Sequence, residues 1–219
     1  NYRDTSLLVE FLTPDYGRVS GVVRGVRSTG KTAKHRRGLM QPFFPLLISW
    51  TGNGELKTIA QFENSAAPLS LMGQRLFSAF YVNELLARLL HRYDSNRDLY
   101  VLYESVLQGL LVERCMDVVL RCFEFRLLVN LGYGVDLLSD INSNEVIEAG
   151  REYLFAADEG FGRVEKSAQQ IESRMLFSGT ELINIREGNF TPSARQAAKR
   201  LSRLALRVHL GFKPLKIRE

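Results

Sequence analysis

The sequence predicts an α+β protein in which a small β-barrel is followed by helices. Up to residue 63 the chain consists of short runs rich in β-branched and aromatic residues, separated by turns. After Pro68 apolar residues recur every three or four positions, which is the spacing of amphipathic helices. The chain is 45% apolar and 24% charged, and no apolar run reaches the ~18 to 20 residues that a bilayer requires, as is typical of a globular protein.

Four strands are expected in the first part of the chain. Their ranges are 6–12, 18–27, 41–51 and 55–61. Pro14-Asp15-Tyr16-Gly17 predicts a turn, because Pro presets φ and Gly tolerates positive φ, and Gly52-Asn53-Gly54 predicts a hairpin connection. Several strands in so short a segment favour a barrel, which leaves no open sheet edge.

Helices are expected to make up most of the remaining chain. The expected helices are 71–90, 99–111, 116–131, 168–178 and one that begins at Pro192, and a hairpin is expected at 152–164. The first three helices are expected to bury one another as a bundle, and Gly132 ends the third.

The final helix has the clearest signals. Thr191 is a favourable N-cap, Pro192 suits the first helical position, and Gly211 follows the last turn. One stripe of this helix is expected to face the protein, and it consists of Ala194, Ala197, Ala198, Leu201, Leu204, Ala205 and Val208. The basic residues Arg195, Lys199, Arg200, Arg203 and Arg207 are expected to face outward or lie along its flanks.

Basic residues gather in two blocks of the chain. Residues 16–54 carry a net charge of +7 without one Asp or Glu, residues 55–192 carry −7, and residues 193–219 carry +7. Two cationic blocks around an acidic middle favour a polyanionic partner, with nucleic acid first, over an ordinary solvated surface. The residues expected to contact DNA are Arg18, Arg24, Arg27, Lys31, Lys34, Arg36, Arg37, Lys199, Arg203 and Arg207.

A phosphate-loop string lies inside the first basic block. Gly25-Val26-Arg27-Ser28-Thr29-Gly30-Lys31-Thr32 satisfies G-x-x-x-x-G-K-[ST]. Such a loop binds phosphate only between a parallel strand and a helix whose N-terminus faces the anion. Residues 33–42 hold too few apolar side chains to anchor a helix, so a loop that contacts DNA is expected here, with a P-loop-like nucleotide-binding protein as an alternative.

No catalytic or metal site is expected. Cys115 and Cys122 lie seven residues apart in a helical segment, a spacing that fits neither a zinc knuckle nor a disulfide framework, and they are expected in the core. His35, His91 and His209 are expected at the surface or at helix ends, without a nucleophile. The two thiols favour a reducing cytoplasm, and the lack of an initiator Met predicts that the natural N-terminus lies upstream.

Seven stretches, in this order, resemble the bacterial RecO family of recombination mediators. They are RDTSLLV at 3–9, GRV and the following residues at 17–25, GLMQPFFPLL at 38–47, GELKT at 54–58, YVNELL at 81–86, FEFRLL with LGYG at 123–134, and AAKRL with KPLK at 197–216. The resemblance covers nearly the whole chain.

The resemblance implies an OB-fold barrel, a helical bundle and a C-terminal region that binds zinc through four cysteines in many relatives. Here Ser139-Asp140-Ile141-Asn142 follows the LGYG stretch, so neither zinc nor another cofactor is expected. The implied parts are an OB-fold DNA-binding domain at 1–66, a helical bundle at 67–135, and a C-terminal helical region with a zinc-less hairpin at 136–219.

The resemblance further implies a mediator without ATPase activity of its own, located in the cytoplasm and associated with the nucleoid. Proteins of this kind bind single- and double-stranded DNA, anneal complementary strands, contact the C-terminal tail of the single-stranded DNA-binding protein, and work with RecR to load the recombinase. An OB barrel holds a strand in a cationic groove with aromatic platforms. The aromatic residues of the first basic block are Tyr16, Phe43, Phe44 and Trp50, and at least half of the last three are expected in the core.

The acidic, Phe-ended tail of the single-stranded DNA-binding protein needs an apolar pocket and a cation for its carboxylate. Arg121 is the first candidate and Arg126 the second, with the alternative that Arg121 pairs with Asp117 on a solvated face. A protein-interaction adaptor whose basic blocks dock acidic tails is the competing function. It would lose its DNA affinity at ~0.15 M salt.

Overall fold

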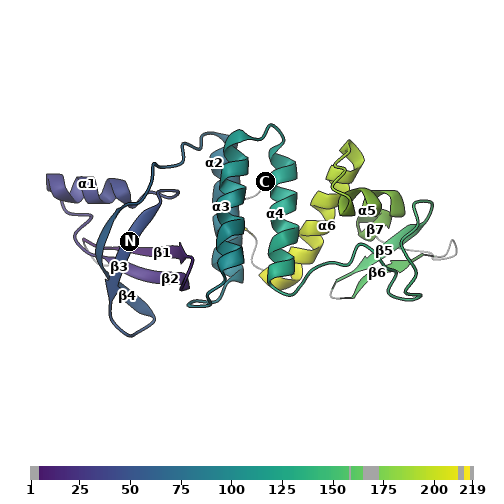
Figure 1. Ribbon diagram of the computed structural model, residues 1–219, viewed down its shortest axis with the longest axis horizontal. Helices are drawn as coiled ribbons and strands as arrows, with labels where there is room; N and C mark the ends of the chain where they lie inside the picture. Colours follow the sequence, from purple (N-terminus) through teal and green to yellow (C-terminus); the bar gives the residue numbers. More distant parts are fainter. Residues whose placement is uncertain (1–4, 158, 165–172, 212–214, 218–219) are drawn as a thin grey trace. The chain divides into compact units, whose positions relative to one another are not determined.

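The structure, a computed structural model, describes residues 5–157, 159–164, 173–211 and 215–217. They form two compact units, of which the first comprises the residues up to Leu111 and those from Lys216 on, and the second comprises Val112–Leu215. The predicted α+β class is confirmed, because an N-terminal sheet precedes the helices. Figure 1 labels the helices and strands. The three-part division at residues 66 and 135 stays a prediction.

The first unit begins with a four-stranded, OB-like sheet. Its strands are β1 (Leu7–Thr13), β2 (Gly17–Val23), β3 (Leu46–Thr51) and β4 (Leu56–Asn64). They lie in the order β1-β2-β4-β3, with β2 parallel to β4 and the other two pairs antiparallel. Parallel neighbours need a crossover connection, which here contains the helix α1 (Lys31–Leu39) and β3.

The core of this sheet is small, and the backbone of β2 passes close to one of its side chains. Val23, Val26 and Ile59 are buried, and Trp50 is among the partly buried side chains that pack against them. A Cβ atom on Gly21 would lie 2.5 Å from Cδ1 of Ile59, so glycine is needed where β2 passes the core.

Two helices complete the first unit, α2 (Gln74–Leu89) and α3 (Arg97–Val112). Their apolar residues recur at helical spacing, and Leu85, Leu99 and Leu110 are almost fully buried. The Tyr103 hydroxyl on α3 donates a 2.8 Å hydrogen bond to the Asn83 side chain on α2. That buried hydroxyl has a strongly raised pKa, mainly because burial disfavours its charged form.

The second unit combines three helices with a small sheet. The elements are α4 (Met116–Asn130), β5 (Glu152–Ala156), β6 (Gly160–Arg163), β7 (Leu176–Ser178), α5 (Gly179–Arg186) and α6 (Pro192–Leu210). The strands lie in the order β6-β5-β7, and α6 packs against both α4 and α5. Two expectations are confirmed: the Thr191 hydroxyl accepts a hydrogen bond from Ala194 N at the start of α6, and Gly132 follows α4 with a φ of 82°.

Asp140 organises the loop where many relatives are expected to carry cysteines. It is buried, and its carboxylate accepts hydrogen bonds from the backbone N–H groups of Asn142 (2.7 Å) and Arg163 (3.1 Å). Ile141 N also donates to Phe161 O. The bonds from Arg163 N to the Asp140 carboxylate and from Ile141 N to Phe161 O join the loop to β6.

Two sequence expectations about secondary structure are wrong. Residues 31–39 form α1, because one buried side chain, Ala33, with the half-buried Leu39 is enough to anchor a mostly polar helix. Residues 176–178 form β7 because they pair with β5, and the rest of the helix expected at 168–178 lies at 173–175, which is a short 3-10 turn, and at 168–172, outside the described residues.

The burial of single side chains was also misjudged at two places. Cys122 is exposed on α4, although the helical spacing placed it in the core. The buried face of α6 also differs from the predicted stripe. Val208 is 45% exposed, whereas Ser202 and Leu206, which the prediction left out, are buried.

The carboxylate of Glu84 on α2 holds the returning end of the chain. It accepts hydrogen bonds from the backbone N–H groups of Lys216 (2.9 Å) and Ile217 (3.0 Å) and pairs with Arg88 at 2.7 Å. Burial raises the pKa of Glu84, but the two backbone hydrogen bonds and Arg88 outweigh burial, and the pKa is lowered. Glu84 of the YVNELL stretch thus binds the backbone of Lys216, the last residue of the KPLK stretch.

We predict that Glu84→Gln lowers the free energy of unfolding by roughly 1 to 3 kcal/mol at neutral pH, because charge-assisted hydrogen bonds are lost. A lowered pKa stabilises the fold above the ordinary Glu pKa of 4.5, and this contribution is lost as the pH falls below it. Urea unfolding of the whole chain between neutral pH and pH 3 should therefore show a shallower acid loss in the variant. Glu159→Gln, at an exposed carboxylate, is the control, and equal effects of both substitutions would contradict the role of Glu84.

Candidate nucleic-acid interface

The first basic block presents its cations mainly on α1 and the turn before it. Arg24, Lys31, Lys34 and Arg37 are exposed and form no ion pair with any described residue. Lys31, Lys34 and Arg37 lie on α1, which begins directly after Gly30 and contains no acidic residue, and Arg24 lies in the turn before it. We call these four residues the α1 cation cluster. Uncompensated positive charge of this kind attracts phosphates without reading sequence.

The remaining predicted residues of the block have internal contacts. Arg18 pairs with Glu10 at 3.6 Å and donates to the backbone oxygen of Ala87, with only 18% of its side chain exposed. Arg18 therefore stabilises the fold, and its guanidinium is not open to a phosphate as the sequence predicted. Arg27 is half-buried, and the guanidinium of Arg36 lies 4.8 Å from the centre of the Phe62 ring.

The phosphate-loop string does precede a helix, contrary to the sequence expectation. Its surroundings nevertheless differ from those of a nucleotide site. Val26 is fully buried in the apolar core, and Arg27 N donates to Thr5 O, so this part of the loop is not open to a phosphate. The helix α1 leads to β3, which is not a neighbour of β2 in the sheet, so the βαβ arrangement that such loops require is not formed by the described strands.

The aromatic residues of this block divide between core and surface. Trp50 packs against the core, and Phe43 lies 5.2 Å from Phe80 of α2, measured between ring centres. Tyr16 is 56% exposed and touches the edge of Trp50 at 5.0 Å. Phe43, Phe44 and Trp50 are all half-buried, and of these three only Trp50 packs against the buried core cluster, so the expectation that at least half of them lie in the core is not met. Tyr16 is the most open ring of the four.

The basic residues of α6 fall into two groups. Lys199, Arg203 and Arg207 follow one another at every fourth position, with Arg203 and Arg207 exposed and Lys199 paired with Asp117 at 3.6 Å. Arg195 and Arg200 serve packing instead. Arg195 donates to the Cys115 sulfur at 3.2 Å, and the Arg200 guanidinium lies 4.2 Å from the centre of the Phe177 ring.

Arg121 on α4, the first candidate for binding the acidic tail, is not available at the surface. Arg121 is 1% exposed and forms a 2.8 Å ion pair with Glu124, which is fully buried. A guanidinium in this position holds an internal carboxylate and does not face solvent. Arg126 is exposed one turn further along the helix, near Cys122. Sequence reasoning missed Glu124, although its spacing of three from Arg121 was a usable signal.

Two absences apply to the described part of the chain. No helix within it combines the length and apolarity needed to span a membrane. Within the same ranges, no three His, Cys, Asp or Glu side chains lie together as a metal site would require.

We predict that Arg121→Ala lowers the free energy of unfolding by roughly 3 to 5 kcal/mol, because the buried carboxylate of Glu124 loses its ion pair with Arg121. The exposed Arg126→Ala should change it by less than about 0.5 kcal/mol. Replacing both partners, by Arg121→Met with Glu124→Leu, should cost less than Arg121→Ala alone. Chemical unfolding measures all three, and a loss below about 1 kcal/mol for Arg121→Ala would place that side chain in solvent.

Comparison with known proteins covers the whole chain. Residues 1–67 match the family described as "Recombination protein O N terminal", and residues 72–219 match "Recombination protein O C terminal". A protein named DNA repair protein RecO from Cellvibrio japonicus (strain Ueda107) is 42% identical over 219 residues, which are 100% of this chain and 90% of that protein. Proteins of the same name from Haemophilus influenzae (strain PittGG) and Coxiella burnetii (strain RSA 331 / Henzerling II) are 40% identical over all of this chain and over 89% and 92% of their own lengths.

Proposed function

The chain belongs to the RecO family, and we propose that it serves DNA repair and recombination as a DNA-binding mediator. In this role it binds and anneals single-stranded DNA and helps load the recombinase on strands coated by single-stranded DNA-binding protein. It acts by binding and not by catalysing a reaction, in the cytoplasm and at the nucleoid.

The observation that carries this proposal is the α1 cation cluster. Four exposed cations lie within one short segment of the OB-like sheet domain, without an acidic residue between them. Phosphate contacts of this type give sequence-independent affinity, which a protein that must act on any broken DNA requires. The row Lys199, Arg203 and Arg207 on α6 supplies a second cationic surface, for DNA or for an acidic partner.

The proposed protein partners are RecR and the C-terminal tail of single-stranded DNA-binding protein. For the tail, Arg126 replaces Arg121 as the proposed cation, because the exposed guanidinium is the accessible one of the two. An adaptor function remains the second candidate, favoured by the same exposed cations, since acidic peptides also bind them.

We predict that replacing Arg24, Lys31, Lys34 and Arg37 together by Gln weakens binding to single- and double-stranded oligonucleotides of any sequence. Each lost phosphate contact should reduce the slope of log K against log salt by about 0.7 on single strands, so the slope should fall by up to about 3. Fluorescence anisotropy between about 0.05 and 0.2 M salt measures both quantities.

The matched control replaces four other exposed arginines, Arg97, Arg114, Arg151 and Arg186, by Gln, with the same change in net charge. It should retain most of the affinity and the slope. Equal losses in the two variants would show that total charge, and not the cluster, drives binding. Loss of wild-type DNA binding at about 0.15 M salt with retained binding of an acidic peptide would favour the adaptor.

A further inference from the structure

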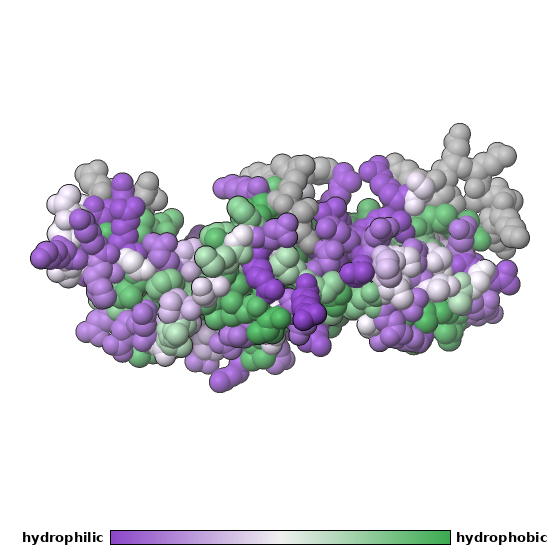
Figure 2. All heavy atoms as spheres, turned by 90° about the horizontal axis from the view of Figure 1, so that it is seen from above, coloured by the Kyte–Doolittle hydropathy of each residue, from purple (hydrophilic) through white to green (hydrophobic). Residues whose placement is uncertain are grey.

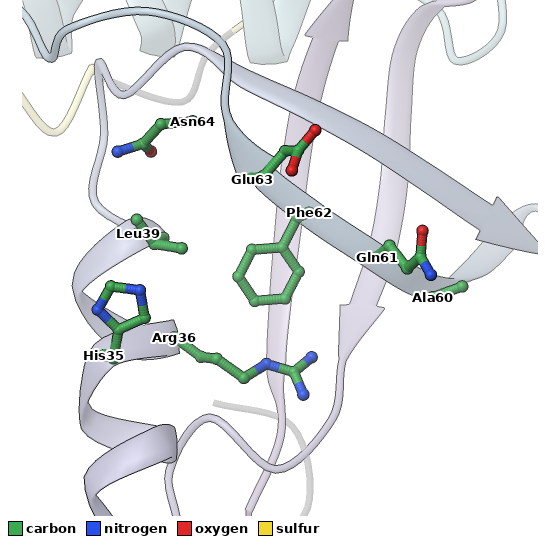
Figure 3. Close-up of a pocket in the computed structure, with 8 residues that line it drawn as sticks. All are labelled: His35, Arg36, Leu39, Ala60, Gln61, Phe62, Glu63 and Asn64. Carbon is green, nitrogen blue, oxygen red and sulfur yellow. The ribbon is translucent and has the colours of Figure 1, made fainter.

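A pocket of about 450 Å³ lies between α1 and β4 in the first unit. Figure 3 shows Phe62 and Asn64 projecting from β4 toward the helix, with His35 and Leu39 opposite them and Arg36 below the ring. The pocket exists because β2 pairs with β4 only as far as Thr58. Beyond that point no described strand pairs with β4 on the side away from β3, and α1 lies beside the open part instead.

The lining of this pocket suits a flat, partly polar ring. Phe62 supplies an aromatic ring, and the Arg36 guanidinium lies over that ring, 4.8 Å from its centre, as a second planar group on which a base can stack. At the rim, the side chains of His35 and Asn64 form no hydrogen bond with any described residue, so their donors and acceptors are open to a ligand. Leu39 supplies an apolar wall.

The charges around the pocket are the carboxylate of Glu63, which Figure 3 shows directed away from α1, and the cations of α1. Lys34 and Arg37 are exposed on the same helix, within one turn of His35 and Arg36. Lys34 and Arg37 can bind the phosphates of a nucleic acid, whereas the aromatic and amide side chains of the pocket suit a base. Figure 2 shows one face of the molecule, on which hydrophilic and hydrophobic residues are interspersed.

We propose that this pocket holds one base of a bound single strand, stacked on Phe62 and Arg36 while the neighbouring phosphates lie on Lys34 and Arg37. The proposal rests on the proposed DNA-binding function and adds the place where a base, and not only the backbone, is held. Because every base has a flat face, stacking of this kind does not select a sequence. It does distinguish an unpaired strand from a duplex, in which the bases are already stacked.

The test compares a thymidine oligonucleotide with one of the same length whose bases are replaced by abasic sites, so that the phosphates are unchanged. Wild type should bind the thymidine strand about tenfold more tightly, the size expected for base stacking. Phe62→Leu should reduce this preference to less than about twofold while affinity for the abasic strand is kept. Phe62→Tyr should retain the preference, and Phe77→Leu, at an exposed Phe on α2, is the matched control.

Phe62 also packs against the core, so Phe62→Leu can destabilise the fold. A second variant therefore changes only exposed side chains at the rim. His35→Ala with Asn64→Ala removes the two rim side chains and should lower the preference at least about threefold. If wild type binds both strands equally, or if Phe62→Leu keeps the full preference, the base pocket is refuted and DNA binding itself stands. If wild type binds neither strand at about 0.15 M salt, the proposed function fails together with the pocket.

Discussion

The parallel pairing of β2 with β4 is the constraint on which the position of the cations depends. Three residue pairs, from Ser20 with Leu56 to Val22 with Thr58, fix this pairing. Because the two strands run in the same direction, the chain between them has to cross the sheet, and the crossover includes α1. Most basic residues of the first block therefore lie on a helix outside the sheet. The same short pairing leaves the later part of β4 open, and α1 lies beside it.

Internal ion pairs separate structural arginines from those available to a partner. Arg18 holds Glu10, Arg121 holds Glu124, and Arg200 covers the Phe177 ring. Each of these side chains is substantially withdrawn from solvent, and its removal would expose or isolate a group that it now covers. In contrast, the side chains of the α1 cation cluster form no ion pair with any described residue. Net charge alone cannot make this distinction, since all of these residues count equally in it.

Much of the fold follows from local patterns in the sequence. Thr191, Pro192 and Gly211 bound α6 because capping and proline chemistry act within a few residues. The β-rich and helical halves follow from the hydrophobic period. The interpretation failed where a distant contact decides the outcome. Residues 176–178 are a strand because β5 pairs with them.

The candidate site was predictable only in part, because contacts between residues distant in the sequence shape it. The density of Lys and Arg between residues 24 and 37 pointed to a cationic surface. The helix that presents it was missed, because Ala33 anchors it through a burial that the sequence does not reveal. The pocket beside Phe62 depends on where β2 stops pairing with β4, and no periodicity encodes that point.

A DNA strand that lies on α1 and the neighbouring edge of β4 covers backbone amide groups there. Amide hydrogen exchange of the whole chain, with and without a thymidine oligonucleotide, locates the covered backbone. We predict slowed exchange in residues 24–40 and 59–64 when DNA is added, both at low salt and at about 0.15 M salt. Slowed exchange confined to the second unit, with residues 24–40 unchanged, would contradict it.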